Sequence, residues 1–205
     1  MQNYYILNFQ KIKGDFMNKS KLSVFKKIPI IQTQRLILRK LLPSDDADMF
    51  EYSKNHAVTK YLLWDVHINK KFTHSYLKFI QSQYASGNFY DWAVTLSESG
   101  KMIGTCGFSS FDLDNDTAEV GYVLSPDHWH KGIAAEALRK VMSFGFEELS
   151  LHRIYARIME GNEASERVAE KCGMRHEATL KSSLLVKGEY RTIKIYAILR
   201  EEFEK

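Results

Sequence analysis

The fold is decided by residues 123–138, which read VLSPDHWHKGIAAEAL. The stretch begins like the apolar end of a strand, passes through a proline and an aromatic, basic turn to Gly132, and ends in a run of good helix formers. The first N–H groups of a helix have no partner within the helix, and the helix dipole adds partial positive charge there. A strand that passes into a helix through such a turn therefore predicts an anion site.

Gly132 is the residue of this turn that a phosphate can approach most closely, because it has no Cβ. His130 and Lys131 add hydrogen-bond donors beside it. The apolar face that anchors the helix consists of Ile133, Ala134, Ala137, Leu138 and Val141. Two common nucleotide motifs are excluded by spacing, since the sequence contains neither G-x-x-x-x-G-K-[ST] nor G-x-G-x-x-G. Taken alone, one glycine at a helix start is also typical of a plain structural turn.

The composition predicts one folded domain. The chain has 205 residues, of which 44% are hydrophobic and 13% aromatic, enough for one core and short for two full domains. Residues 1–29 hold six lysines and one acid, a net charge of +5, so residues 30–205 contribute −1 to the net charge of +4. We expect a flexible basic extension over residues 1–29 and the domain over residues 30–205. Nucleic acid is not the expected partner, because residues 30–205 show no basic stripe.

The cysteines and the hydropathy indicate a metal-free cytoplasmic protein. Cys106 and Cys172 lie in a predicted strand and a predicted helix, without the spacing of a disulfide or metal pair. Reduced thiols that fill a core are typical of cytosolic proteins. No apolar run approaches the ~20 residues that a membrane span needs. We therefore expect no membrane partner and no metal, and a monomer or a homodimer.

Strands and helices alternate along the predicted chain. Period-2 patterns and turn signals predict strands over residues 30–41, 91–96, 101–111, 118–124 and 153–159, and two more around the turn Lys187-Gly188. Helical patterns predict helices over residues 43–54, 73–85, from the opening stretch to about 149, and 164–172. Gly87 and Gly173 end two of these helices.

The opening stretch also carries a family resemblance. Residues 118–138 read AEVGYVLSPDHWHKGIAAEAL and resemble the acetyl-coenzyme A motif of the GNAT superfamily of N-acetyltransferases, in its RimJ/RimL-like (ribosomal-protein N-terminal acetyltransferase-like) branch. The motif is usually written [Q/R]-x-x-G-x-[G/A]. Gly132 and Ala134 fit it, and Trp129 stands at the Gln/Arg position, as is common in the branch. His130 departs from the pattern, since a glycine is usual there.

Three further segments resemble the same branch. Residues 161–174 read GNEASERVAEKCGM and match N-x-x-S-x-x-V-x-E-K-x-G-[MF]; residues 32–39 (QTQRLILR) look like the opening strand, and residues 186–191 (VKGEYR) like the closing hairpin. The resemblance covers about residues 30–203. It implies an α/β (α+β) fold with a mixed, largely antiparallel sheet flanked by helices, in which two central parallel strands, here 118–124 and 153–159, splay apart.

The resemblance further implies acetyl-coenzyme A as cosubstrate. Backbone groups of the strand end would pair with the pantetheine amides as another strand would, and the amides of the turn would hold the pyrophosphate. The implied cofactor-binding residues are Tyr122, Val123, Leu124, Trp129, His130, Lys131, Gly132, Ile133, Ala134, Asn162, Ser165, Val168 and Lys171. Without the resemblance, Asn162 reads as a helix N-cap and Ser165 as a solvated helical serine.

The implied reaction is direct attack of a primary amine on the thioester. An ammonium has no lone pair, so a base must take its proton. Glu119 is the candidate base, because it lies on the strand whose downstream end would position the acetyl group; its alternative role is a strand carboxylate paired with a lysine or arginine. A backbone N–H near Val123 or Leu124 would bind the oxyanion. Ser165 is the candidate that protonates the leaving thiolate.

The acceptor site is expected in the N-terminal half, where Tyr61, Trp64, Tyr90 and Trp92 form an aromatic group. We predict that Trp64, Tyr90 and Trp92 bind the acceptor, although aromatic residues are also ordinary core. The acids at positions 45, 46, 48 and 51 cluster at a predicted helix start, where capping explains them. We therefore expect a protein N-terminal α-amino group or a small primary amine rather than a polyamine.

Two other functions are compatible with the sequence. A GNAT-like fold could bind acetyl-coenzyme A as a non-catalytic sensor or interaction module, which the departure at His130 permits. An RNA-associated protein could use the lysine-rich tail, and its binding would then be sensitive to salt. Consumption of the thioester in the presence of amines separates the first alternative from an enzyme.

Overall fold

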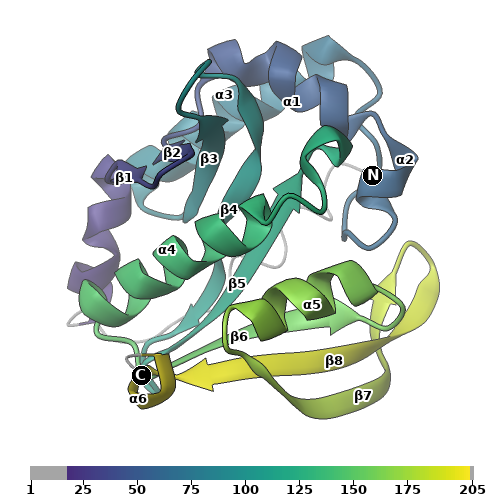
Figure 1. Cartoon of the computed structure of the whole chain (residues 1–205). Helices are drawn as coiled ribbons and strands as arrows, with labels where there is room; N and C mark the ends of the chain where they lie inside the picture. Colours follow the sequence, from purple (N-terminus) through teal and green to yellow (C-terminus); the bar gives the residue numbers. More distant parts are fainter. Residues whose placement is uncertain (1–17, 204–205) are drawn as a thin grey trace.

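The computed structural model describes residues 18–203 and is built around one sheet of eight strands (Figure 1). The strand order across the sheet is β1-β2-β3-β4-β5-β6-β8-β7. The strands are β1 (Ile31–Gln32), β2 (Leu36–Arg39), β3 (Asp91–Leu96), β4 (Met102–Asp112), β5 (Thr117–Leu124), β6 (Arg153–Met159), β7 (Arg175–Val186) and β8 (Glu189–Leu199). Only β5 and β6 pair in parallel, and every other neighbouring pair is antiparallel. The predicted mixed, largely antiparallel sheet is confirmed.

Helices cover the sheet, and two of them define the region of interest. The helices are α1 (Asp46–Ser53), α2 (His56–Thr59), α3 (Lys70–Ser86), α4 (Ile133–Glu147), α5 (Glu163–Lys171) and α6 (Arg200–Phe203), with 3-10 turns η2 (Asn18–Lys27), η3 (Pro43–Asp45) and η4 (Pro126–His128). Figure 1 shows α4 and α5 side by side on one face of the sheet. There α4 contacts β4, β5 and β6, and α5 contacts β6 and β8.

The predicted helices occur, with shifted bounds. The expected helix over 43–54 is a 3-10 turn followed by α1, and α3 starts before residue 73 because the side chain of Asn69 caps it. At its end, Gly87 takes φ 72°, a conformation that favours glycine. The short helix α2 was not predicted. Four residues are too few to show a helical period in the sequence.

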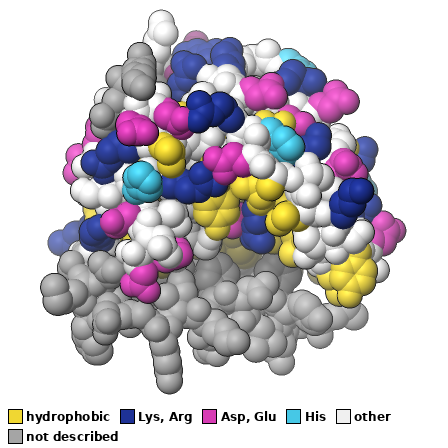
Figure 2. All heavy atoms as spheres, turned by 90° about the horizontal axis from the view of Figure 1, so that it is seen from below, with side chains coloured by type: hydrophobic (Ala, Val, Ile, Leu, Met, Phe, Trp, Pro, Cys, Tyr) yellow, Lys and Arg dark blue, Asp and Glu magenta, His cyan; other side chains and the backbone are white. Residues whose placement is uncertain are grey.

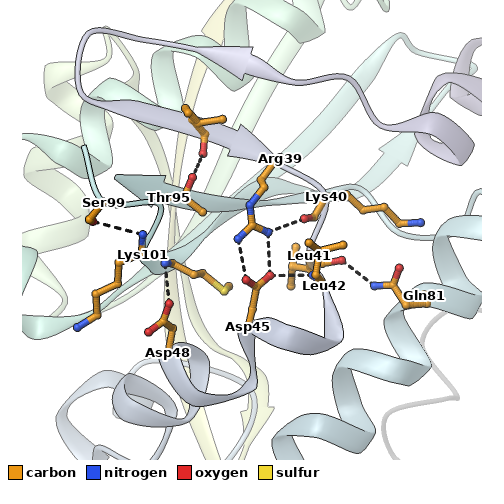
Figure 3. A network of polar contacts seen from close by, with 12 residues as sticks. Arg39, Lys40, Leu41, Leu42, Asp45, Asp48, Gln81, Thr95, Ser99 and Lys101 are labelled. Atoms are coloured by element: carbon orange, nitrogen blue, oxygen red, sulfur yellow. Dashed lines mark hydrogen bonds and ion pairs between the residues drawn. The ribbon is translucent and has the colours of Figure 1, made fainter. Parts of the chain in front are cut away.

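A polar network fixes the start of α1 against the sheet (Figure 3). Arg39 on β2 donates to both carboxylate oxygens of Asp45, at 2.8 and 2.7 Å, and Asp45 also accepts from the backbone N–H of Leu42. The hydrogen bonds that Arg39 donates to Asp45 outweigh the effect of burial and raise the pKa of Arg39. Asp48 accepts from the backbone N–H of Met102 at 2.9 Å. These acids are therefore structural.

Residues 21–29 pack against the rest of the folded domain. Phe25 is fully buried and packs edge-on against Tyr90 and Trp92. Lys21 forms an ion pair with Asp116 at 2.7 Å. The prediction of a flexible extension over residues 1–29 is therefore wrong for residues 18–29, and residues 1–17 lie outside the described part of the chain. The lysines of this segment are typical of a solvated tail, so the sequence pattern did not indicate that Phe25 is buried.

The described surface and core agree with an ordinary globular domain. Figure 2 shows a face on which Lys and Arg side chains are interspersed with Asp and Glu. Cys106 and Cys172 are free thiols in the core, as predicted. Among residues 18–203, no helix is long and apolar enough to cross a membrane. The same residues hold no group of three or more His, Cys, Asp or Glu side chains that could bind a metal ion.

The Phe25 contacts predict a large cost for truncating this side chain. Phe25→Ala should lower the free energy of unfolding by about 3–5 kcal/mol, because it leaves a cavity among buried rings. Urea unfolding followed by tryptophan fluorescence measures the change. Ile30→Ala is the matched control, because Ile30 is 66% exposed and should cost less than about 1 kcal/mol. Equal losses in the two variants would contradict the packing described.

Candidate active site

The central feature of the sheet is the point where β5 and β6 part. Their parallel pairing extends over Thr117–Glu119 and Arg153–Tyr155 and then ends. Beyond it, β5 stays paired with β4, and β6 with β8. Residues 120–124 and 156–159 thus leave the pairing on their facing edges, where backbone N–H and C=O groups need other partners. The splayed pair implied by the family resemblance is present.

A pocket of about 440 Å³ lies at this opening. Every predicted cofactor-binding residue lines it except Lys131, whose carbonyl accepts from Arg35 Nη1 at 3.0 Å. The residues brought together are Tyr122, Val123, Leu124, Trp129, His130, Gly132, Ile133, Ala134, Asn162, Ser165, Val168 and Lys171. The sequence did not predict the wall formed by α2 and the loop after it, which contains Ala57, Val58, Tyr61 and Leu62. Four other lining residues were also not predicted, namely His128, Ala135, Ala164 and Arg167.

The turn between β5 and α4 is held to the strand end by Trp129. Its indole N–H donates to the carbonyl of Leu124 at 2.9 Å. The backbone N–H of Trp129 donates to the carbonyl of Pro126 at 3.1 Å, which closes the turn η4. A tryptophan at the usual Gln/Arg position of the motif thus has a structural reason: it fixes where the turn lies relative to the strand.

The start of α4 has the properties of an anion site. Gly132 is the N-cap residue with φ 74°, and His130 has φ 59° although it is not glycine. A Cβ built on Gly132 would lie 3.6 Å from Lys171 Nζ and 3.8 Å from an Arg35 guanidinium nitrogen. Two cations therefore flank free helical N–H groups, which together favour a phosphate. His130 holds a conformation that costs a non-glycine residue free energy.

Arg35 and Glu136 connect this turn to the first strands. Glu136, in the first turn of α4, accepts from Thr33 Oγ1 at 2.5 Å and from Arg35 Nε at 2.7 Å. Burial would raise the pKa of Glu136, but the hydrogen bonds from Thr33 and Arg35 lower it overall. The segment QTQRLILR indicated a strand and gave no sign of this contact, because Arg35 and Glu136 are far apart in the sequence.

The wall on the α5 side contains the predicted thiolate partner, Ser165. The side chain of Asn162 accepts from the Ser165 N–H at 3.3 Å and caps α5, as its N-cap reading predicts. The Tyr122 hydroxyl donates to the Ser165 carbonyl at 3.2 Å. Burial raises the pKa of Tyr122 far above its usual range, so its phenol stays protonated at neutral pH. Tyr122 and Ser165 thus each bring a hydroxyl group to this wall of the pocket.

Glu119, the predicted general base, lies where the opening between β5 and β6 begins. It is the last β5 residue that pairs with β6, and it is 8% exposed. Its Oε1 accepts from Arg157 Nε at 2.9 Å, and its Oε2 from Ser110 Oγ at 3.4 Å. It is not among the residues that line the pocket. The arginine pair is the alternative role expected from the sequence, and the catalytic role stays a prediction.

The three aromatic residues predicted to bind the acceptor do not line the pocket. Trp92 is fully buried, and its indole N–H donates to the Pro29 carbonyl, so its predicted substrate contact is wrong. Tyr90 packs edge-on against Phe111 and Phe25. Trp64 packs against His67, whose pKa burial lowers to about 4. Tyr61, from the same aromatic group, does reach the pocket.

Comparison with known proteins agrees with this geometry. Residues 35–175 match the model of the acetyltransferase (GNAT) domain. The chain is 31% identical over 172 residues to the "Uncharacterized N-acetyltransferase YoaA" of Bacillus subtilis, covering 84% of this chain and 97% of that one. It is 33% identical over 122 residues to the "Putative ribosomal N-acetyltransferase YdaF" of the same organism, covering 60% of this chain and 66% of that one.

A solved structure shows the same fold. The GNAT-family acetyltransferase from Bacillus anthracis superposes with a TM-score of 0.76 at 30% identity, covering 85% of this chain and all of that one. The chain therefore belongs to the GNAT acetyltransferase family. It is an acetyl-coenzyme A-dependent N-acetyltransferase with RimJ/RimL-like relatives.

The geometry at Gly132 predicts the effect of a side chain there. Gly132→Val should weaken acetyl-coenzyme A binding by roughly tenfold or more, because a β-branched residue is strained at this φ and its side chain displaces Lys171 and Arg35. Isothermal titration calorimetry measures the affinity. Gly100→Val is the matched control: Gly100 has a similar φ of 71° and open space around it, so the strain is alike but the affinity should hold. Unchanged binding in a folded Gly132→Val protein would contradict the anion site.

Proposed function

We propose that the opening between β5 and β6 binds acetyl-coenzyme A, and that the enzyme passes the acetyl group by direct attack to a primary amine, either a protein N-terminal α-amino group or a small amine. The observation that carries this proposal is the end of β5–β6 pairing after Glu119 and Tyr155. It leaves backbone groups of residues 120–124 free to pair with the amides of the pantetheine arm, as an added strand would.

The two ends of the pocket suit the two ends of this ligand. At the start of α4, helical N–H groups with Lys171 and Arg35 nearby would bind the pyrophosphate. Further into the opening along β5, the thioester would lie near Val123 and Leu124, one of whose N–H groups would bind the oxyanion. Acetyl-coenzyme A supplies the activated acetyl group, and residues of this chain supply position and proton transfer.

Proton transfer has one candidate base and two candidate donors. Glu119 adjoins the opening and would take the amine proton through a water molecule. Its carboxylate also forms an ion pair with Arg157, at 2.9 Å. The leaving thiolate would receive its proton or a hydrogen bond from Ser165, and the protonated phenol of Tyr122 lies against the same turn of α5.

The charges of the N-terminal half favour a single amine over a polyamine. A polyamine needs several carboxylates that converge on one channel. The acids of the 45–51 cluster are already engaged: Asp45 with Arg39, Asp46 with Lys70 and His74, Asp48 with the N–H of Met102, and Glu51 with Lys54. We place this reaction in the cytoplasm, in a monomer or homodimer.

The Glu119 assignment predicts a pH-dependent defect. Glu119→Gln should lower kcat/KM by ~10²-fold or more at pH 7, because the base is lost, and the defect should shrink at high pH, where free amine accumulates. Steady-state kinetics across pH 6–10 measures both. Arg157→Gln is the control: if Glu119 only holds Arg157, the two variants should lose stability alike and keep turnover. Ser165→Ala should slow turnover less, because water can replace the hydroxyl.

The acceptor class predicts the result of a substrate screen. Release of the coenzyme A thiol should be fastest with N-terminal peptides or small primary amines, because the pocket region offers no converging carboxylates. The screen compares peptides, amino acids, amino sugars and spermidine at equal concentration. Fastest release with spermidine and none with peptides would contradict the acceptor class. Binding of acetyl-coenzyme A without release for any amine would identify a non-catalytic sensor instead.

A further inference from the structure

A second pocket lies beside the cofactor pocket and is separate from it. Its volume is about 250 Å³. Its wall is formed by the end of α2, the end of β6 and the start of β8, through Lys60, Tyr61, Met159, Glu160, Tyr190, Arg191 and Thr192. The two pockets share Tyr61. Because Tyr61 lines both pockets, an amine bound in the second pocket would lie next to the wall of the cofactor pocket.

Hydrogen bonds fix the walls of this second pocket. The Tyr61 hydroxyl donates to the carbonyl of Gly161 at 2.7 Å, which links the segment after α2 to the end of β6. The backbone N–H of Glu160 donates to the carbonyl of Thr192 at 3.0 Å, which links β6 to β8. Lys187 donates to the carbonyl of Thr59 at 2.8 Å. Both halves of the chain thus hold the pocket in a defined shape.

The pocket is lined by exposed side chains of both charge signs. Lys60 Nζ lies 4.9 Å from the centre of the Tyr61 ring, and neither Lys60 nor Glu160 forms an ion pair within residues 18–203. Arg191 pairs with Glu189 on the same strand, and the two side chains are 46% and 67% exposed, so this pair contributes little. Two cations and one carboxylate therefore line a pocket whose volume suits a ligand of moderate size.

From these charges we propose that the acceptor is an amine that also carries an acidic group, held with its ammonium toward Glu160 and its acidic group toward Lys60 and Arg191. This inference rests on the proposed acetyl transfer to a primary amine. A polycation would meet two cations for one carboxylate, whereas an amine with a carboxylate or phosphate group matches both signs. The same chemistry occurs in an amino acid and in a peptide with an acidic side chain near its N-terminus.

Acceptors matched in shape but not in charge test the proposal. The full-length enzyme is assayed by thiol release with three pairs: an amino acid and its amide, phosphoethanolamine and ethanolamine, and peptides with Asp or Asn at the second position. We expect kcat/KM to be about tenfold or more higher for the acidic member of at least one pair, as a charge-assisted hydrogen bond would give. The pair that responds identifies the source of the acidic group.

Substitutions in the second pocket test whether it causes the preference for acidic acceptors. Lys60→Gln should raise KM for the acidic acceptor by about fivefold or more and leave KM for its neutral partner and for acetyl-coenzyme A unchanged. Lys60→Glu should reverse the preference, and Glu160→Gln should weaken both members of a pair. Lys140→Gln, an exposed lysine on α4, is the matched control and should change nothing.

Three outcomes would overturn the proposal. Equal kcat/KM within every pair would show that no acidic group is recognised, while the proposed acetyl transfer would stand. A preference for acidic acceptors that Lys60→Glu leaves intact would place the recognition elsewhere. No thiol release with any amine would overturn the proposed function and this inference together.

Discussion

The structure depends on where β5 and β6 stop pairing. Three residue pairs hold the two halves of the sheet together, and then the strands part after Glu119 and Tyr155. A buried backbone group left without a partner costs about 1–3 kcal/mol, so the opening is stable only if water or a ligand takes the place of the missing strand. Contacts across it set its width: Tyr122 reaches Ser165 on α5, and Tyr61 reaches Gly161.

Much of the lining of the pocket between β5 and β6 could be predicted because it is encoded locally. The turn at Gly132 and the cap at Asn162 each combine a strand end, a turn residue and a helix start within a short stretch, and the sequence shows such signals directly. The rest depends on contacts between distant segments. Phe25 looks like part of a basic tail, yet it fills the core beside Trp92, and no local pattern indicates that burial.

The same limit explains the acceptor side. The sequence pattern does not show which of the aromatic residues at positions 61, 64, 90 and 92 belong to the core and which line a pocket. Their burial depends on the packing of β3 and β4 against residues 18–29. Trp92 and Tyr90 entered that packing, and Tyr61 did not. Glu119 shows the opposite case: alternation along β5 predicted its position, but its partner Arg157 lies on the parallel neighbour, which the strand pattern alone does not identify.

An acid at an anion site needs a reason, and Glu136 has one. A carboxylate in the first turn of α4 would repel a pyrophosphate if it were free. Here Thr33 and Arg35 bind both of its oxygens, while Arg35 also donates to the Lys131 carbonyl. The carboxylate thus serves to hold a guanidinium at the start of α4, where that cation, with Lys171, faces the turn. The turn between β1 and β2 would thereby supply a cation to the proposed phosphate site, because the ion pair of Arg35 with Glu136 joins this turn to the start of α4.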